Sequence, residues 1–197
     1  MKTTAVTIQL IAMTVLTTSA WAQGTTAEKD QQRDVNQQQR IEQGLQSGQL
    51  STREAGSLER QEQHIDKMEA RDLKNGSISP AEQARLNAAQ NRVSHRIYAD
   101  KHNGVTGNPG SASSQRMQAD VQRDVNQQKR IQNGMDSGAL TNREAGKLER
   151  GQARVSGREA KAAADGHVGA REQRGIQRAE NRQSAHIFRK KHNAVAR

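Results

Sequence analysis

The sequence contains no cysteine, only two prolines, and a single residue each of tryptophan, tyrosine and phenylalanine. The absence of cysteine excludes disulfide bonds and thiolate metal ligands, whatever the redox state of the compartment. So few aromatic residues, together with a mean hydropathy of -1.03, leave little material for a large apolar core. What the chain does have is a regular helical periodicity in residues that are mostly Gln, Arg, Ala and Glu.

Residues 1–22 have the features of a secretory signal peptide. Lys2 provides a positive start, residues 5–16 are largely apolar, and the small-any-small pattern of a cleavage site ends at Ala22. The apolar stretch is shorter than the ~20 residues that a membrane anchor needs. We therefore expect cleavage near Ala22 and a periplasmic or secreted mature chain.

The chain carries an internal duplication with a register of 90 residues. RDVNQQQRI at 33–41 matches RDVNQQKRI at 123–131, and the alignment of 33–103 with 123–193 needs no gap. Each half is interpreted as helix, tight turn, helix, tight turn, helix. The predicted fold class is therefore all-α, a tandem duplication of a three-helix unit built from a short helix and an antiparallel helical hairpin.

Gly, Pro and Ser residues at 104–114 predict a flexible linker between two separately folded units. The expected units are residues 23–103 and a second, basic repeat at 115–197. Glycines at 151, 157 and 175 enter the predicted helices of the second unit at ~1 kcal/mol each relative to Ala. We expect the second unit to be the less stable one.

In the first repeat, apolar spacing predicts a helix ending near Leu45, a second from Thr52 to about Leu73 and a third from Pro80 to about Lys101. Most of the predicted hairpin helices begin with a capping box, in which a Ser or Thr and a Glu three residues later accept each other's backbone N–H. The pairs are Ser51 with Glu54, Ser79 with Glu82, and Thr141 with Glu144.

A fourth start, at Gly169 with Glu172, has no side-chain oxygen at the cap and should be the weakest. A glycine suited to a left-handed conformation precedes each start. These glycines are Gly48, Gly76, Gly138 and Gly166.

The four turns resemble the second half of an EF-hand loop, where Gly at position six is followed by an aliphatic residue at eight and Glu at twelve. The resemblance implies an alternative function, calcium binding, through Glu54, Glu82, Glu144, Asp165 and Glu172. The first half of each loop departs from the family, because residues such as Gln43 and Leu45 stand where calcium needs carboxylate oxygens. Capping accounts for each Glu without an ion, so no metal site is favoured and no cofactor is expected.

A second resemblance is to the LTxxQ motif of periplasmic stress chaperones and metal-responsive proteins of Gram-negative bacteria. The matching strings are residues 50–54, 78–82 and 140–144, with Glu in place of the motif's Gln. This resemblance implies another alternative, a periplasmic chaperone-like or stress-response protein that binds client proteins. The repeats are also similar to exported helical repeat proteins of proteobacteria, which have no known activity to transfer.

The sequence lacks a nucleophile elbow, an HExxH motif, a phosphate loop and a cysteine nucleophile, so we interpret it as a non-enzymatic binding or interaction protein. Its charge is uneven. Residues 33–103 contain 11 Lys and Arg against 10 Asp and Glu, whereas residues 123–193 contain 16 against 8. The second repeat therefore suits an anionic partner, such as an anionic polymer or a membrane surface.

The candidate residues for this contact form a stripe on the last predicted helix. Five arginines at helical spacing lie within about 80° of one another at ~100° per residue. They are Arg171, Arg174, Arg178, Arg182 and Arg189. Because aromatic residues are nearly absent, base stacking is unavailable and no specific readout of nucleic acid is expected. The oligomeric state stays open.

Overall fold

The computed structural model describes residues 26–193, so the expected signal peptide at 1–22 lies outside the described residues. Six α-helices and one 3-10 helix (η1) form the secondary structure of residues 26–193, and no strand occurs among them. They are α1 (Thr26–Ser47), α2 (Thr52–Asp72), η1 (Leu73–Asn75), α3 (Pro80–Lys101), α4 (Ala112–Asp136), α5 (Asn142–Ala162) and α6 (Ala170–Lys191). The all-α prediction is confirmed. None of the six helices combines the length and the apolar composition that crossing a membrane requires.

The helices begin where the local signals predict. Ser51, Ser79 and Thr141 each accept the backbone N–H three residues later, and the Glu at that position accepts the N–H of the cap. At the start of α6 only half of this arrangement exists, because Gly169 N donates to Glu172 but offers no acceptor in return. The glycines at 48, 76, 138 and 166 have φ between 66° and 95°, a left-handed conformation that glycine adopts without steric cost.

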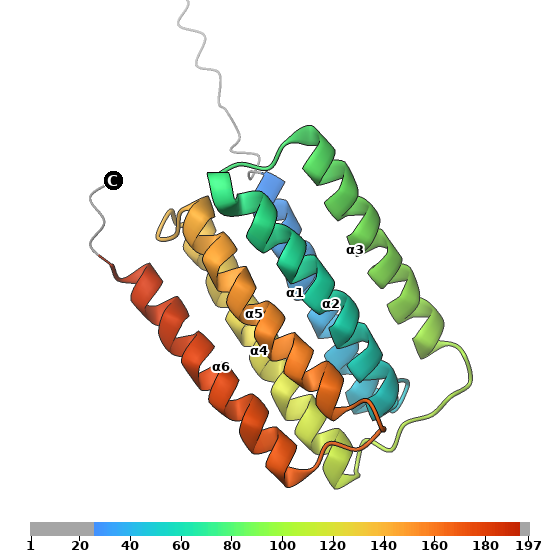
Figure 1. The fold of residues 1–197 in the computed structure, drawn as a ribbon. Coiled ribbons are helices and arrows are strands. Elements are labelled where there is room, and N and C mark those ends of the chain that lie inside the picture. Colours follow the sequence, from blue (N-terminus) through green and yellow to red (C-terminus); the bar gives the residue numbers. More distant parts are fainter. Residues whose placement is uncertain (1–25, 194–197) are drawn as a thin grey trace, which may run out of the picture.

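Helices α1, α2, α4 and α5 form a central bundle, and α3 and α6 cover its two opposite sides (Figure 1). Contacts are most extensive between α2 and α5, followed by α1 with α4. Both pairs are antiparallel. Gly56 near the start of α2 lies against Ala163 just beyond α5, and Gln132 near the end of α4 donates to Gln32 near the start of α1 at 2.6 Å.

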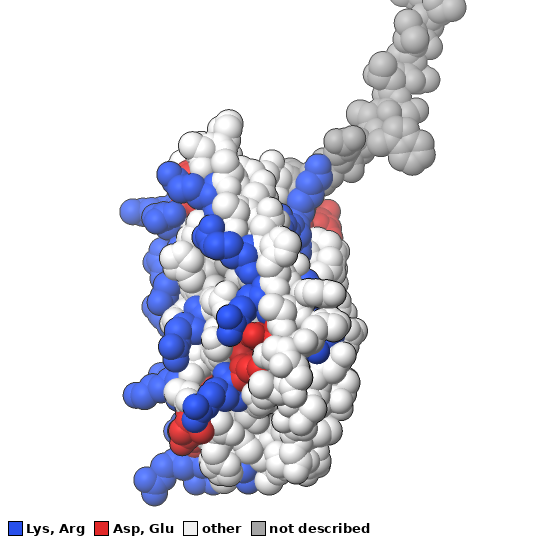
Figure 2. All heavy atoms as spheres, turned by 90° about the vertical axis from the view of Figure 1, so that its right-hand side faces the viewer, with Lys and Arg blue, Asp and Glu red and all other residues white. Residues whose placement is uncertain are grey.

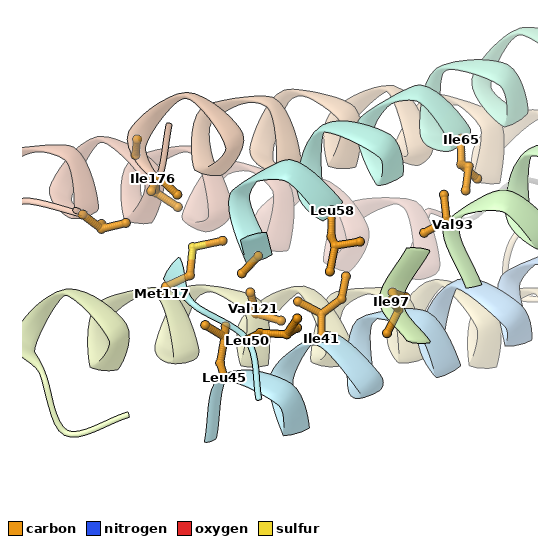
Figure 3. Close-up of a cluster of buried hydrophobic side chains, with 14 of the residues drawn as sticks. Ile41, Leu45, Leu50, Leu58, Ile65, Val93, Ile97, Met117, Val121 and Ile176 are labelled. Carbon is orange, nitrogen blue, oxygen red and sulfur yellow. The ribbon is translucent and has the colours of Figure 1, made fainter. Parts of the chain in front are cut away.

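The residues before and after the 104–114 connection share one core. The larger apolar cluster contains Ile41 and Leu58 from the first half together with Met117, Val121 and Ile176 from the second (Figure 3). The expectation of two separately folded units is therefore corrected. The physical reason is that α2 buries two faces: an apolar one against α3, and a second one against α5.

The connection between the halves was expected to be flexible, but it is docked on the bundle. Gly107 N donates to Gly48 O at 2.8 Å, and a Cβ at Gly107 would collide with the carbonyl oxygen of Leu50. Helix α4 already begins at Ala112, inside the predicted linker, where Ser111 caps it. The segment therefore fixes the start of α4 against the turn between α1 and α2.

Two glycines that were expected to weaken the second half instead make room for glutamine side chains, one buried and one half-buried. A Cβ at Gly151 would collide with Gln183, whose Nε2 donates to Leu148 O at 2.9 Å. A Cβ at Gly157 would collide with Gln63 in the same way. The relative stability of the two halves stays a prediction.

Replacing Gly56 by Ala is expected to destabilise the protein, although Ala favours helix by about 1 kcal/mol. The new Cβ would lie 2.5 Å from Cβ of Ala163, and overpacking of this kind costs about 1–3 kcal/mol. Gly175 in α6 is the matched control, because the nearest atom to a Cβ there is Arg178 Nη2 at 4.0 Å. Urea unfolding should show Gly175→Ala stabilised and Gly56→Ala destabilised. A stabilised Gly56→Ala would contradict the close approach of α2 and α5.

Candidate functional site

The five carboxylates of the EF-hand resemblance do not converge on one point. Glu54 Oε2 accepts from Ser51 N and Oγ at 2.9 and 2.7 Å, and its Oε1 accepts from Asn103 Nδ2 at 2.7 Å. The other four also accept a backbone N–H within their own turns; they are Glu82, Glu144, Asp165 and Glu172. Within residues 26–193, the three-carboxylate groups close enough to share an ion contain none of the five.

The predicted arginine stripe on α6 is exposed along its whole length, at Arg171, Arg174, Arg178, Arg182 and Arg189. Only Arg182 and Arg189 line a hollow of the surface. The remaining three arginines line neither of the hollows between α5 and α6. The stripe is therefore divided between a groove and the open outer face of α6.

The groove between α5 and α6 consists of two adjoining hollows of about 350 and 360 Å³, which share Gly151, Arg154 and His186. Cationic or titratable side chains line both walls: Lys147, Arg150, Arg154 and Arg158 from α5, and Arg182, His186, Arg189 and Lys190 from α6. No carboxylate lines either hollow. Figure 2, which views the α3 side of the molecule, shows Lys and Arg gathered along the edge that faces the viewer in Figure 1, where α2 and α5 lie in front. We call the surface formed by the two hollows between α5 and α6 the α5–α6 groove.

Acidic side chains show the opposite distribution. Most of the 21 Asp and Glu residues are buried, whereas no Lys, Arg or His among residues 26–193 is buried. Removing a carboxylate from water is costly unless a cation, a proton or several hydrogen-bond donors compensate it. The core of the bundle therefore holds many more acidic groups than cationic groups.

Most of the buried carboxylates lie on the four helices of the central bundle. On α2 they stand at residues 59, 62, 66 and 69, whose steps of three, four and three place them on one helix face. The two apolar clusters include residues of all four central helices, and the larger one continues along α2 to Met68 and onto α3. Helix α2 thus buries an apolar face with Leu58 and Ile65 beside the face that carries the carboxylates.

Two groups of three carboxylates converge, with oxygens that all lie within 4.8 Å of one another in each group. Site 1 consists of Glu59 from α2, Asp124 from α4 and Glu159 from α5. Site 2 consists of Asp66 and Glu69 from α2 and Glu149 from α5. Because residues 59 and 69 are ten positions apart, the two sites are separated by roughly 15 Å along α2.

Site 2 receives hydrogen bonds from amide and hydroxyl groups. Each of its carboxylates has one such donor: Ser156 Oγ to Asp66 at 3.1 Å, Gln31 Nε2 to Glu69 at 3.2 Å, and Gln128 Nε2 to Glu149 at 3.3 Å. These donors fix the orientation of the three side chains. They leave Oε1 of both Glu69 and Glu149 without a donor.

Site 1 has far fewer donors. Gln38 Nε2 donates to Glu59 Oε2 at 3.1 Å. Glu59 Oε1 and both oxygens of Asp124 and Glu159 have no N–H or hydroxyl donor, although these side chains are at most 1% exposed. Five buried carboxylate oxygens at this point therefore depend on protons or on a cation.

Asp34 lies 90 residues before Asp124 of site 1. The two carboxylates differ in their hydrogen-bond donors. Gln90 Nε2 donates to Asp34 Oδ1 at 2.9 Å, and Gln31 Nε2 lies 3.5 Å from its Oδ2. The positions 90 residues after these two glutamines hold Glu180 and Val121. The second half therefore has two fewer amide donors at this place and one more carboxylate next to site 1.

Burial is the largest cause of the pKa shifts in this region. It raises the pKa of Asp34 and Glu59 to about 7 and that of Glu149 to about 8. Burial and neighbouring carboxylates together raise the pKa of Asp124 and Glu159 well above the ordinary range. When no cation is bound, these groups therefore remain protonated to unusually high pH.

Comparison of the chain with protein-family models, with curated proteins and with solved structures found no match. Its function must be inferred from the chemistry of its own residues.

Sequence reasoning missed both carboxylate sites and half of the groove. It assigned charged residues to solvated helix faces, so the regular carboxylate spacing at 59–69 was not weighed as a buried face. The signal was present, since Glu59, Glu69 and Asp34 each have an identical residue 90 positions later. The α5 wall of the groove was visible in the same way, as arginines at residues 150, 154 and 158, each four residues apart.

Protein freed of metal with a chelator is expected to lose stability as the pH rises from about 4.5 to 8. The unfolded chain releases these protons near its ordinary carboxyl pKa of about 4, whereas the folded chain keeps them until its raised pKa values near 7 and 8. A group such as Glu59, whose pKa rises from 4.5 to about 7, costs on the order of 3 kcal/mol above pH 7. Thermal unfolding in EDTA across this range checks the sign; a Tm that rises towards pH 8 would contradict it.

Proposed function

We propose that this protein is an exported, non-enzymatic metal-binding protein that holds hard cations such as Ca²⁺ or Mn²⁺ in the carboxylate sites of its core. The observation that carries the proposal is site 1, where five fully buried carboxylate oxygens have no N–H or hydroxyl donor. We propose further that the fold arose by duplication of a three-helix unit. Sites 1 and 2 would then be partial counterparts, since Glu59 and Glu159 of site 1 correspond to Glu149 and Glu69 of site 2, whereas Asp124 corresponds to Asp34 outside site 2.

The ligand set favours hard cations. Both sites offer only carboxylate oxygens, and carboxylates prefer Ca²⁺, Mg²⁺ and Mn²⁺ over the softer metals that His and Cys select. Oxygens bound to one Ca²⁺ lie 2.3–2.6 Å from it, so two on opposite sides are about 5 Å apart. The spacing within 4.8 Å at each site falls inside this limit.

Site 1 is expected to bind more tightly than site 2. The hydrogen-bond donors at site 2 already compensate part of its charge, whereas site 1 has one donor and a further carboxylate, Glu180, in its surroundings. Glu180 itself is paired with Arg123 at 3.1 Å, so part of its charge is neutralised. The uncompensated charge is therefore greatest on Glu59, Asp124 and Glu159.

The position of the sites supports binding without turnover. No residue of site 1 or site 2 lines any of the five surface hollows found on the described part of the chain. An organic substrate has no open approach to these carboxylates, whereas a small ion needs only a transient opening of the bundle.

Calcium or manganese ions added to chelator-treated protein at pH 7.5 are expected to raise its Tm. A ligand at 100 times its Kd stabilises the folded state by about 2.7 kcal/mol, which corresponds to roughly 5–10 °C for a chain of this length. Differential scanning calorimetry at increasing ion concentrations measures this rise. The absence of any rise with Ca²⁺, Mn²⁺ and Mg²⁺ would contradict the proposal.

Replacing Glu159 by Gln should have opposite effects on the two forms. The metal-free protein becomes more stable, because a buried group that must be protonated is replaced by a neutral one. The rise in Tm on adding the ion becomes smaller, because a ligand is lost. A structural role alone does not predict this reversal.

Glu62→Gln is the matched control. Glu62 is buried on the same face of α2 but belongs to neither site, and the residue 90 positions later is already Gln152. This variant should stabilise the metal-free protein and leave the ion-induced rise unchanged. If both variants lost the rise equally, site 1 would not be the binding site.

A further inference from the structure

We infer that the α5–α6 groove binds a linear chain of phosphate groups, of the kind found in inorganic polyphosphate or in the backbone of a single-stranded nucleic acid. The inference is independent of metal binding, because no carboxylate of site 1 or site 2 lines the groove.

The walls of the groove carry cations at regular intervals. Arg150, Arg154 and Arg158 follow one another every four residues on α5, which spreads them over about 12 Å. Arg182 and Arg189 stand on the opposite wall, on α6. Arginine binds phosphate oxygens in a bidentate manner, so two facing rows suit a chain with anions on both sides.

These cations are available to a ligand. Among the described residues that line the groove, the structure shows an ion pair only for Lys190, with Glu144 at 3.7 Å. All three α5 arginines at 150, 154 and 158 are exposed. Mutual repulsion of so many unpaired cations favours the arrival of a polyvalent anion.

The floor of the groove explains why the backbone of a chain, and not its bases, would be recognised. Gly151, Val155 and Ala179 contribute small or aliphatic surfaces, and no Phe, Tyr or Trp lines either hollow. Base stacking therefore has no platform beyond the ring of His186. Two adjoining hollows of about 350 and 360 Å³ provide space for a chain lying between the walls.

The opposite side of the molecule shows that the fold does not require this charge. The positions 90 residues earlier lie on α2 and α3, where Met68, Ala99 and Asp100 stand in place of Arg158, Arg189 and Lys190. There Asp100 pairs with Arg96 at 2.9 Å. Arg60, Arg85 and Arg92 also line hollows between α2 and α3, so the α5–α6 side differs by its additional cations at residues 154, 158, 189 and 190.

The test measures binding of fluorescently labelled polyphosphate and labelled single-stranded DNA to the mature chain, by anisotropy at several salt concentrations. The groove variant carries Arg154→His, Arg158→Met and Arg189→Ala, the residues found at the corresponding positions on α2 and α3. The matched control carries Arg171→Ala, Arg174→Ala and Arg178→Ala, which removes three arginines from the exposed outer face of α6. Circular dichroism verifies that both variants remain helical.

At pH 7.5 and 0.15 M salt the groove variant should bind about 10–100-fold more weakly, with a salt slope lower by about 2, as expected for three lost phosphate contacts. The outer-face control should lose less than about threefold, because its charges act only at a distance. Binding of both probes indicates that the groove recognises any chain of phosphate groups. Binding of polyphosphate alone indicates that the ligand is inorganic polyphosphate and not a nucleic-acid backbone.

Three results would overturn the inference: no binding of either probe, equal losses in the two variants, or tighter binding to vesicles of anionic phospholipid than to polyphosphate. The last result would assign the basic face to a membrane. The groove variant keeps both carboxylate sites, so its ion-induced rise in Tm should persist. Failure of the phosphate-binding inference is therefore distinguishable from failure of the metal-binding proposal.

Discussion

The burial of carboxylates without buried cations is the constraint on which the rest of the structure depends. Sites 1 and 2, with Asp34 and Glu62 beside them, place eight acidic side chains in the middle of a four-helix arrangement whose Lys and Arg residues all lie at the surface. Such a core is stable only if the acidic groups are protonated, hydrogen-bonded or bound to cations. Hydrogen bonds from side chains compensate part of the charge at site 2, whereas site 1 has almost no such donors. The difference follows from a few residues, above all Val121 and Glu180 where the first half has glutamines.

The remaining architecture holds this acidic centre together. Two apolar clusters join the helices, and α3 and α6 contribute to them from opposite sides of the bundle (Figure 1). Glycines at 56 and 146 let α2 and α5 approach closely enough for their carboxylates to converge. The docked connection around Gly107 fixes where α4 begins. Because the acidic groups are inside, the outer surface is more cationic than the formal net charge of +10 suggests. This separation of charge accounts for both an interior suited to cations and a groove suited to anions.

The sequence predicted those features that local interactions determine. Capping boxes located the starts of α2, α3 and α5, and glycines located the turns, because each depends on residues within one helical turn. The apolar residues whose spacing predicted these helices, such as those at 58, 65 and 97, are fully buried. The pairing of α2 with α5 could not be predicted, since the faces that meet carry Glu and Asp, which amphipathic patterns assign to solvent. The carboxylate sites were missed for the same reason: site 1 combines residues 35 to 100 positions apart, and site 2 joins Asp66 and Glu69 to Glu149, about 80 positions later.

The account is tested most directly by a crystal structure of the protein grown with Mn²⁺, using the anomalous scattering of the ion to locate it. It predicts an anomalous peak among Glu59, Asp124 and Glu159, with carboxylate oxygens about 2.2 Å from the ion. A weaker peak among Asp66, Glu69 and Glu149 would agree with the difference in hydrogen-bond donors between the sites. Peaks confined to the surface, with the five oxygens of site 1 still in contact only with one another, would contradict the claim that this core is built to hold a metal ion.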